Sequence, residues 1–224
     1  PEILNWPKKE GRISLKLDLL NEANQLHSGQ AHRALSDVET TIALAKKLKA
    51  NQAIWDWAMA CFQKTEDQIR LQQCATLSKD NPNHAIAFML DGRFGEKRSF
   101  LRPAISLGIH EHYNNQTLWL ALDEIPLSQV GEDFDAHFRL IMKKKWGEPP
   151  LMLPYKSRYE KHLSANRQAC MQDNMNWLIN NVEWLQTVSK HFRSKTYSTI
   201  EGVDVDAALY QLPFKSQTDE NLCK

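Results

Sequence analysis

The chain has 224 residues, of which 42% are hydrophobic and 25% are charged, and 28 basic against 27 acidic side chains leave a net charge of +1. This composition is ordinary for a globular protein and excludes wholesale disorder. The near-neutral charge does not indicate a nucleic-acid or membrane partner, although it does not exclude local basic patches. The longest apolar run, at residues 85–90, is far shorter than the ~20 residues of a membrane-spanning helix, so no membrane partner is expected.

The 4 cysteines are scattered through the chain without any Cys-x-x-Cys spacing. This pattern argues against both a disulfide framework and a structural zinc site. A reducing compartment follows as the simpler setting, and we expect a cytoplasmic protein.

Residues 1–77 have the apolar spacing of helices. Within residues 33–49, apolar side chains recur at steps of three and four, and lysines occupy the last turn, where the helix dipole favours cations. The apolar stripe consists of Leu35, Val38, Ile42 and Ala45. A second helix is predicted over residues 54–77.

The pattern changes after a polar, proline-containing run at residues 78–83, which we interpret as a domain boundary. Short apolar runs separated by turn residues then predict a small antiparallel barrel or sheet. The predicted strands are residues 84–90, 99–101, 104–109 and 117–122, with a helix at about 133–145 and a last strand at 151–153. The helical pattern resumes at residue 166, with an apolar seam from Met171 to Leu185.

Basic clusters with nearby aromatic residues are the first candidate for function. Such clusters can follow a phosphate backbone while aromatic rings stack on bases. The loop cluster is the most promising, because Gly92 and Gly95 mark a connection between strands. It consists of Arg93, Lys97, Arg98 and Arg102, and further basic clusters lie at residues 143–145 and 156–161. Each cluster read alone also fits a solvated surface.

Two histidine patterns carry weaker signals. His110 and His112 would share one face of a strand and could take a metal with a third ligand, although an exposed strand end is the simpler interpretation. His32 precedes Asp37 by five residues, and the two converge only if His32 lies at the helix entry. Asp37 would then hold a divalent metal while His32 takes a proton from water, which suits phosphodiester hydrolysis. The numbers of histidines and aspartates in this chain make such a spacing common by chance, so this pair alone is weak.

The residues around this pair strengthen it, because they resemble the end of the exonuclease domain of bacterial exodeoxyribonuclease I. That family consists of DEDDh-type 3′→5′ exonucleases acting on single-stranded DNA. Further matches follow in the same order along nearly the whole chain. The matching segments are residues 14–24, 27–28, 31–38, 41–46, 92–95 with Pro103, 165–170, 173–174 and 205–210.

The resemblance implies an α+β chain with three parts. Residues 1–77 are expected to form the helical tail of a ribonuclease H-like exonuclease domain, residues 78–165 an SH3-like β-barrel domain, and residues 166–224 the start of a C-terminal helical domain. His32 matches the catalytic histidine and Asp37 the metal-binding aspartate of the family's last exonuclease motif. Two Mg²⁺ ions are the implied cofactors of the complete enzyme.

The same resemblance implies partners and a limit on activity. The implied partners are single-stranded DNA, the acidic and hydrophobic tail of single-strand DNA-binding protein, and an N-terminal half of the exonuclease domain. The family's Asp-x-Glu motif on an early strand and its second aspartate have no counterpart here, so the chain alone is expected not to cleave DNA. Two alternatives stay open: a non-catalytic module that binds single-stranded DNA or protein, and a scaffold derived from a nuclease.

Overall fold

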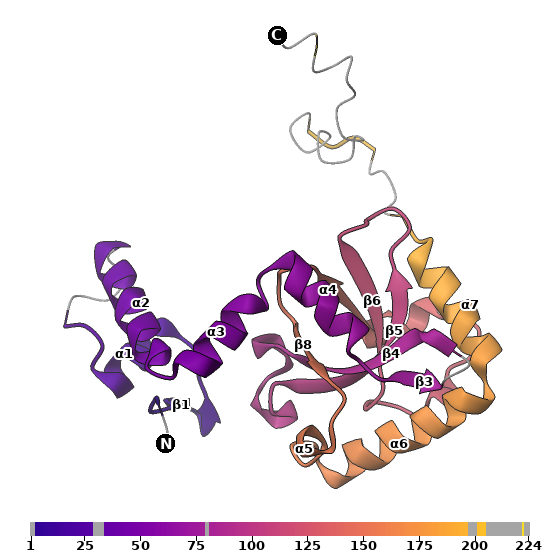
Figure 1. Cartoon of the computed structure of the whole chain (residues 1–224), viewed down its shortest axis with the longest axis horizontal. Helices are drawn as coiled ribbons and strands as arrows, with labels where there is room; N and C mark the ends of the chain where they lie inside the picture. Colours follow the sequence, from indigo (N-terminus) through magenta and orange to yellow (C-terminus); the bar gives the residue numbers. More distant parts are fainter. Residues whose placement is uncertain (1–2, 29–33, 79–80, 197–200, 205–220, 222–224) are drawn as a thin grey trace. The chain divides into compact units, whose positions relative to one another are not determined.

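The computed structural model describes residues 3–28, 34–78, 81–196, 201–204 and 221 (Figure 1). Contacts divide the chain into a unit of residues 1–194, which contains all the elements named below, and a unit of residues 195–224. No helix in the described ranges is long and apolar enough to cross a membrane.

The N-terminal region begins with a short hairpin of β1 (Lys8–Lys9) and β2 (Arg12–Ile13). Glu10 and Gly11 form its turn with φ of 53° and 77°, the left-handed conformation that such tight turns require. Helices α1 (Leu17–Asn24) and α2 (Ala34–Lys49) follow. The prediction of a helix ending at Lys49 is confirmed.

Helix α2 buries the polar residues Ser36 and Thr40 and leaves its apolar stripe in solvent. Leu35 is 71% exposed, and Val38 and Ile42 are also exposed. Soluble helices normally turn their apolar stripe toward a core, so this face lacks a covering surface among the described residues.

The single helix predicted over residues 54–77 is wrong, because the chain forms two helices and a strand there. These are α3 (Gln52–Ala60), α4 (Lys64–Gln72) and β3 (Thr76–Ser78). The turn between the helices lets the Arg70 guanidinium return to the Trp57 carbonyl at 3.1 Å and to the Cys61 sulfur at 2.6 Å. These tertiary hydrogen bonds, together with strand pairing after α4, override the local helical pattern.

The predicted antiparallel sheet is present and has six strands. In addition to β3 they are β4 (Asn81–Leu90), β5 (Leu101–Ile109), β6 (Gln116–Ala121), β7 (Ile141–Lys145) and β8 (Leu151–Pro154). The order is β3-β4-β5-β6-β7, and β8 also pairs with β4. Because Ser78 pairs with Asn81, the polar run at 78–83 has described residues in two paired strands of this sheet.

The helix predicted at about 133–145 is wrong. A 3-10 segment, η4 (Asp135–Leu140), leads into β7, which pairs along β6. Burial alternates along β7, with Met142 and Lys144 buried and their neighbours more exposed, as the two-residue period of a strand requires. Lys144 is therefore an inward-facing core residue within a run of three lysines.

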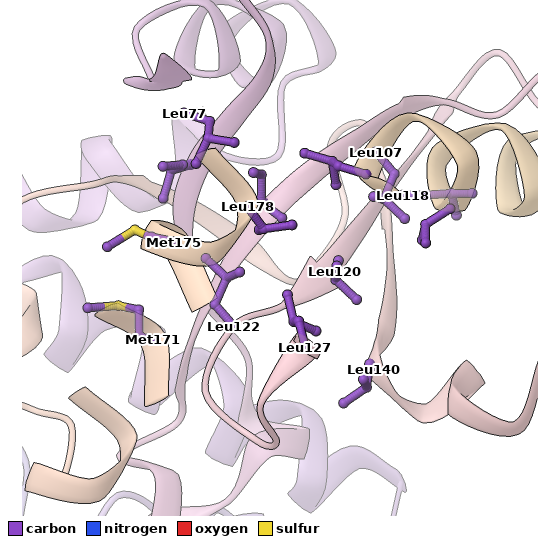
Figure 2. Close-up of a cluster of buried hydrophobic side chains, with 14 of the residues drawn as sticks. Leu77, Leu107, Leu118, Leu120, Leu122, Leu127, Leu140, Met171, Met175 and Leu178 are labelled. Carbon is purple, nitrogen blue, oxygen red and sulfur yellow. The ribbon is translucent and has the colours of Figure 1, made fainter. Parts of the chain in front are cut away.

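One face of the sheet packs against α6 (Ala165–Asn180) and α7 (Val182–Arg193), which run along it in Figure 1. Figure 2 shows leucines of the strands meeting Met171, Met175 and Leu178 of α6. The predicted apolar seam is buried at Met171, Met175, Leu178 and Leu185, whereas Val182 is half-buried and the helix breaks at Asn181. A short helix, α5 (Ser157–Glu160), precedes α6.

The opposite face of the sheet holds a second core cluster. Trp119 is fully buried there among alanines of neighbouring strands, whose small side chains leave room for the indole. Its Nε1 donates to Thr117 Oγ1 at 2.9 Å, so the buried indole N–H is satisfied. Cys74 and Leu71, from α4 and the residues after it, close this cluster. The sheet is thus covered on both faces.

A buried ion pair joins α4 to the sheet. Asp67 of α4 and Lys144 of β7 are both fully buried, and the Lys144 Nζ donates to Asp67 Oδ2. The same ammonium donates to the carbonyls of Lys145 at 3.0 Å and Glu148 at 2.6 Å. Gly147 N–H also donates to Asp67 Oδ2, at 3.0 Å. The pair therefore fixes the β7–β8 loop to α4 as well as β7 itself.

Lys144→Met is expected to destabilise the chain by about 3–5 kcal/mol, because it leaves the Asp67 carboxylate buried without a cation. Urea unfolding measures this loss. The double variant Asp67→Leu/Lys144→Met should lose less than Lys144→Met alone, because no charge is then stranded. Lys145→Met is the matched control, since that side chain is 51% exposed, and should change stability by less than about 0.5 kcal/mol. Equal effects of the two lysine variants would contradict this account.

Candidate nucleic-acid interface and catalytic residues

Asp37 lies in the first turn of α2 and is half-buried. The positive end of the helix dipole favours a negative charge at this position. Its backbone carbonyl accepts a hydrogen bond from Thr41 Oγ1 at 2.7 Å, within the helix. The carboxylate is thus presented at the helix start by a regular backbone. His32 lies outside the described residues, so its relation to Asp37 stays a prediction.

The described residues form no group of three or more His, Cys, Asp or Glu side chains that could hold a metal ion. Asp37 fits a divalent cation as one ligand, because carboxylate oxygen is the donor that Mg²⁺ prefers and the side chain reaches solvent. The His110 ring is buried, and its Nδ1 accepts the backbone N–H of His112 at 3.1 Å. That nitrogen is therefore occupied by a structural hydrogen bond.

The predicted basic loop folds as two 3-10 turns, η1 (Gly92–Phe94) and η2 (Glu96–Arg98), between β4 and β5. Asp91 caps η1 by accepting the Arg93 backbone N–H at 2.8 Å. Arg93 also returns its guanidinium to this carboxylate, with Nε at 3.0 Å and NH2 at 2.6 Å. Its side chain is nevertheless 73% exposed, so Arg93 presents a positioned cation to solvent.

The contact with Arg93 changes the pKa of the Asp91 carboxyl. Burial alone would raise the pKa of Asp91, but hydrogen bonds from the Arg93 side chain and backbone hold that pKa below its ordinary value. Asp91 is therefore charged at neutral pH and stabilises the loop through Arg93.

Arg98 and Arg102 turn toward carboxylates that follow β6. Arg102 NH2 lies 2.6 Å from Glu124 Oε2, and Arg98 NH2 lies 3.3 Å from the same oxygen. Arg102 is 7% exposed, whereas Lys97 is exposed. The structure thus gathers the four predicted binding residues around one loop but places them differently. Arg93 and Lys97 reach solvent, Arg98 is half-buried, and Arg102 is buried in an ion network.

Sequence reasoning missed the acidic half of this network. Asp123 is fully buried and accepts from Arg167 Nε at 2.7 Å and NH2 at 2.5 Å. Arg167 Nη1 and Nη2 also donate to the carbonyls of Arg98 and Leu101, respectively. Helix α6 therefore holds the segment from Arg98 to Leu101 at both of its ends. The signal that could have revealed it was an acidic pair, Asp123-Glu124, placed directly after a buried strand.

No family model matches the chain. It is 29% identical over 137 residues to Exodeoxyribonuclease I of Escherichia coli (strain K12), covering 59% of this chain and 27% of the relative. Exodeoxyribonuclease I of Buchnera aphidicola subsp. Acyrthosiphon pisum is 30% identical over 125 residues, 55% of this chain and 28% of the relative.

The fold agrees with these relatives. A crystal structure of E. coli Exonuclease I in complex with a dT13 oligonucleotide superposes with a TM-score of 0.76 and 24% identity, over 98% of this chain and 48% of that chain. The sequence and the fold of this chain are therefore similar to those of exodeoxyribonuclease I. The chain spans about half the length of the solved Exonuclease I chains that it matches.

Arg93→Ala is expected to raise the pKa of Asp91 and to weaken the chain in a pH-dependent way. A carboxyl whose pKa is lowered by folding stabilises the native state above its unfolded pKa, about 3.9, and loses this contribution as pH falls through the folded value. The difference in unfolding free energy between wild type and variant should be largest at neutral pH and shrink below about pH 3. Urea unfolding at a series of pH values measures it.

Lys97→Ala on the same loop serves as the control and should give a difference that does not change with pH. A wild-type to Arg93→Ala difference that is constant from neutral to acid pH would show that Asp91 and Arg93 are not coupled.

Proposed function

We propose that this chain is part of a metal-dependent 3′→5′ exonuclease that degrades single-stranded DNA to mononucleotides in DNA repair or recombination. The observation that carries the proposal is the similarity to Exodeoxyribonuclease I, at 29–30% identity over more than half of the chain. Such hydrolysis requires a phosphodiester backbone held beside a metal site, and the chain offers exposed cations and a presented carboxylate for these tasks.

In this proposal Asp37 is one metal ligand and His32 the general base. The carboxylate at the start of α2 helps to hold a Mg²⁺ pair completed by carboxylates elsewhere in the whole protein. Two bound Mg²⁺ ions supply charge stabilisation to the scissile phosphate and make water easier to deprotonate. His32 takes the proton from the attacking water as the water oxygen bonds to phosphorus and the bond from phosphorus to the 3′ oxygen breaks. The negative charge on the leaving 3′ oxygen would be stabilised by the bound metal until that oxygen takes a proton from solvent.

The remaining parts have positioning roles. Residues 1–77 belong to a ribonuclease H-like exonuclease domain, residues 78–165 form an SH3-like domain, and residues 166–224 begin a helical domain. Arg93 and Lys97 contact the DNA backbone directly, while Arg98 and Arg102 shape the loop that presents them. The exposed stripe of α2 supports a covering partner, the N-terminal half of the exonuclease domain.

Two further aspects concern the cellular setting. The tail of single-strand DNA-binding protein, acidic and hydrophobic, is a proposed partner that recruits the enzyme to its substrate. The described cysteines Cys61, Cys74 and Cys170 are free thiols, which supports a reducing, cytoplasmic location.

The alternative function is a non-catalytic module that grips single-stranded DNA or protein. The ion network around Asp123 supports this alternative, because the network holds the basic loop rigid and needs no metal site. The two functions differ in one observable result, which is whether hydrolysis accompanies binding.

His32→Ala in the complete protein is expected to lower turnover on labelled single-stranded DNA by at least ~10²-fold, because a positioned general base contributes about that much. DNA binding should stay near the wild-type level. The same assay on the 224-residue chain alone should release no mononucleotides above background, because Asp37 by itself cannot organise two metals.

Wild-type turnover by the His32→Ala protein would remove His32 from the mechanism. Robust 3′→5′ release by the chain alone would show that it carries a complete metal site. Binding without hydrolysis by the complete wild-type protein, with Mg²⁺ present, would establish the binding module instead.

A further inference from the structure

We propose that the β1–β2 hairpin and the η1–η2 loop form one surface that binds the phosphate backbone of single-stranded DNA. This hairpin–loop surface consists of Lys8, Lys9, Arg12, Arg93 and Lys97. It deepens the proposed function, on which it rests, by adding three cations from a segment far from the loop in sequence.

A backbone-to-carboxylate hydrogen bond joins the two segments. The N–H of Ile13, the last residue of β2, donates to Glu96 Oε2 at 2.9 Å. The same two segments also approach each other at Leu15, which follows β2, and Gly92, which begins η1. A Cβ atom added to Gly92 would lie 3.3 Å from Leu15 Cδ1. The hydrogen bond is thus flanked directly in sequence by Arg12 on the hairpin and Lys97 on the loop.

The charge on this surface is predominantly positive. Lys8, Lys9 and Arg12 are all exposed, and so is Lys97. The nearby carboxylates are largely engaged: Glu96 accepts from the hairpin backbone and Asp91 from Arg93. Within the hairpin itself Glu10 is the single acidic residue against three basic ones. A phosphate backbone is a polyanion that such a set of exposed cations fits.

An exposed aromatic ring accompanies these cations. Trp6, two residues before β1, is 48% exposed. The hairpin that follows it is joined at its base by the Ser14 N–H, which donates to the Pro7 carbonyl at 2.9 Å. Single-strand binding surfaces combine cations along the backbone with aromatic rings on which bases stack. The combination favours single-stranded DNA over an acidic polypeptide, which has no bases to stack.

The first test measures binding of a fluorescent oligothymidylate to the 224-residue chain across a range of salt concentrations. The hairpin variant, Lys8→Gln/Lys9→Gln/Arg12→Gln, should bind at least about tenfold more weakly at low salt. Its plot of log affinity against log salt should be shallower by about 2, since each lost phosphate contact removes about 0.7 from the slope. Thermal unfolding checks that the variant folds like wild type.

A matched control removes the same charge elsewhere. Lys46, Lys49 and Lys190 are exposed residues of α2 and α7, and their triple glutamine variant should keep the wild-type salt slope. Equal losses in the control and the hairpin variant would overturn the inference, because only net charge would matter. Wild-type binding by the hairpin variant would overturn it too, while leaving the proposed function intact.

Two other outcomes bear on the partner class. No binding of oligothymidylate by the wild-type chain would contradict both the hairpin–loop surface and the proposed role of this chain in DNA binding. Poly-glutamate that competes with oligothymidylate equally well, and is unaffected by Trp6→Ala, would assign the surface to acidic polypeptides and overturn the DNA assignment.

A pair of substitutions at Glu96 separates positioning from charge. Glu96→Gln keeps an oxygen that accepts the Ile13 N–H and removes a negative charge, so DNA affinity should stay equal or rise. Glu96→Ala removes the same charge and also the acceptor, so affinity should fall about threefold or more despite the more positive surface. Tighter binding by both variants would show that the hairpin needs no attachment to the loop.

Discussion

The pair between Asp67 and Lys144 is the contact on which the arrangement of unit 1–194 depends. Two ions without solvent access are stable only when their hydrogen-bonding groups are also engaged. The Lys144 ammonium meets this condition through the carbonyls of Lys145 and Glu148. Asp67 meets it at Oδ2, which also accepts the Gly147 N–H, whereas its buried Oδ1 has no hydrogen-bond partner among the described residues. A Cβ atom at position 147 would lie only 2.8 Å from the Phe62 carbonyl oxygen. Glycine at this position therefore allows the β7–β8 loop to pack closely against the α3–α4 turn. Helix α4 and the α3–α4 turn are thereby held to the sheet.

A second ionic network, around Asp123, supports the basic loop of the candidate interface. Asp123 receives the Arg167 guanidinium, and Arg167 in turn holds the carbonyls at both ends of the segment from Arg98 to Leu101. This arrangement fixes the backbone of the basic loop while leaving the side chains of Arg93 and Lys97 in solvent. Positioned cations on a rigid support lose less conformational freedom on binding than cations on a mobile loop.

The sequence predicted local features where one element determines its own pattern. The end of α2 at Lys49 follows from apolar spacing and terminal lysines, and the strands around residues 84–90 and 117–122 follow from short apolar runs. It misjudged residues 141–145, because three consecutive lysines are typical of a solvated face. Burial of Lys144 depends on Asp67, 77 residues away, which no local pattern shows.

The candidate site divides in the same way. The family resemblance assigned a role to Asp37, and the clustering of basic residues near Gly92 and Gly95 predicted the basic loop, since both signals lie in contiguous segments. Neither signal could show that Arg102 is buried, because that depends on Glu124 and Asp123 arriving from the next strand. The meeting of Ile13 with Glu96 is likewise invisible in sequence, since a main-chain donor leaves no residue signature.

Native-state hydrogen exchange on the 224-residue chain tests most directly whether the ion pair unites α4 with the sheet. Amides of α4, of β7 and of Gly147 should exchange with the same opening free energy and the same dependence on urea, because they open as one cooperative unit. Exchange of the α4 amides through an opening several kcal/mol less costly than that of β7 would contradict the account.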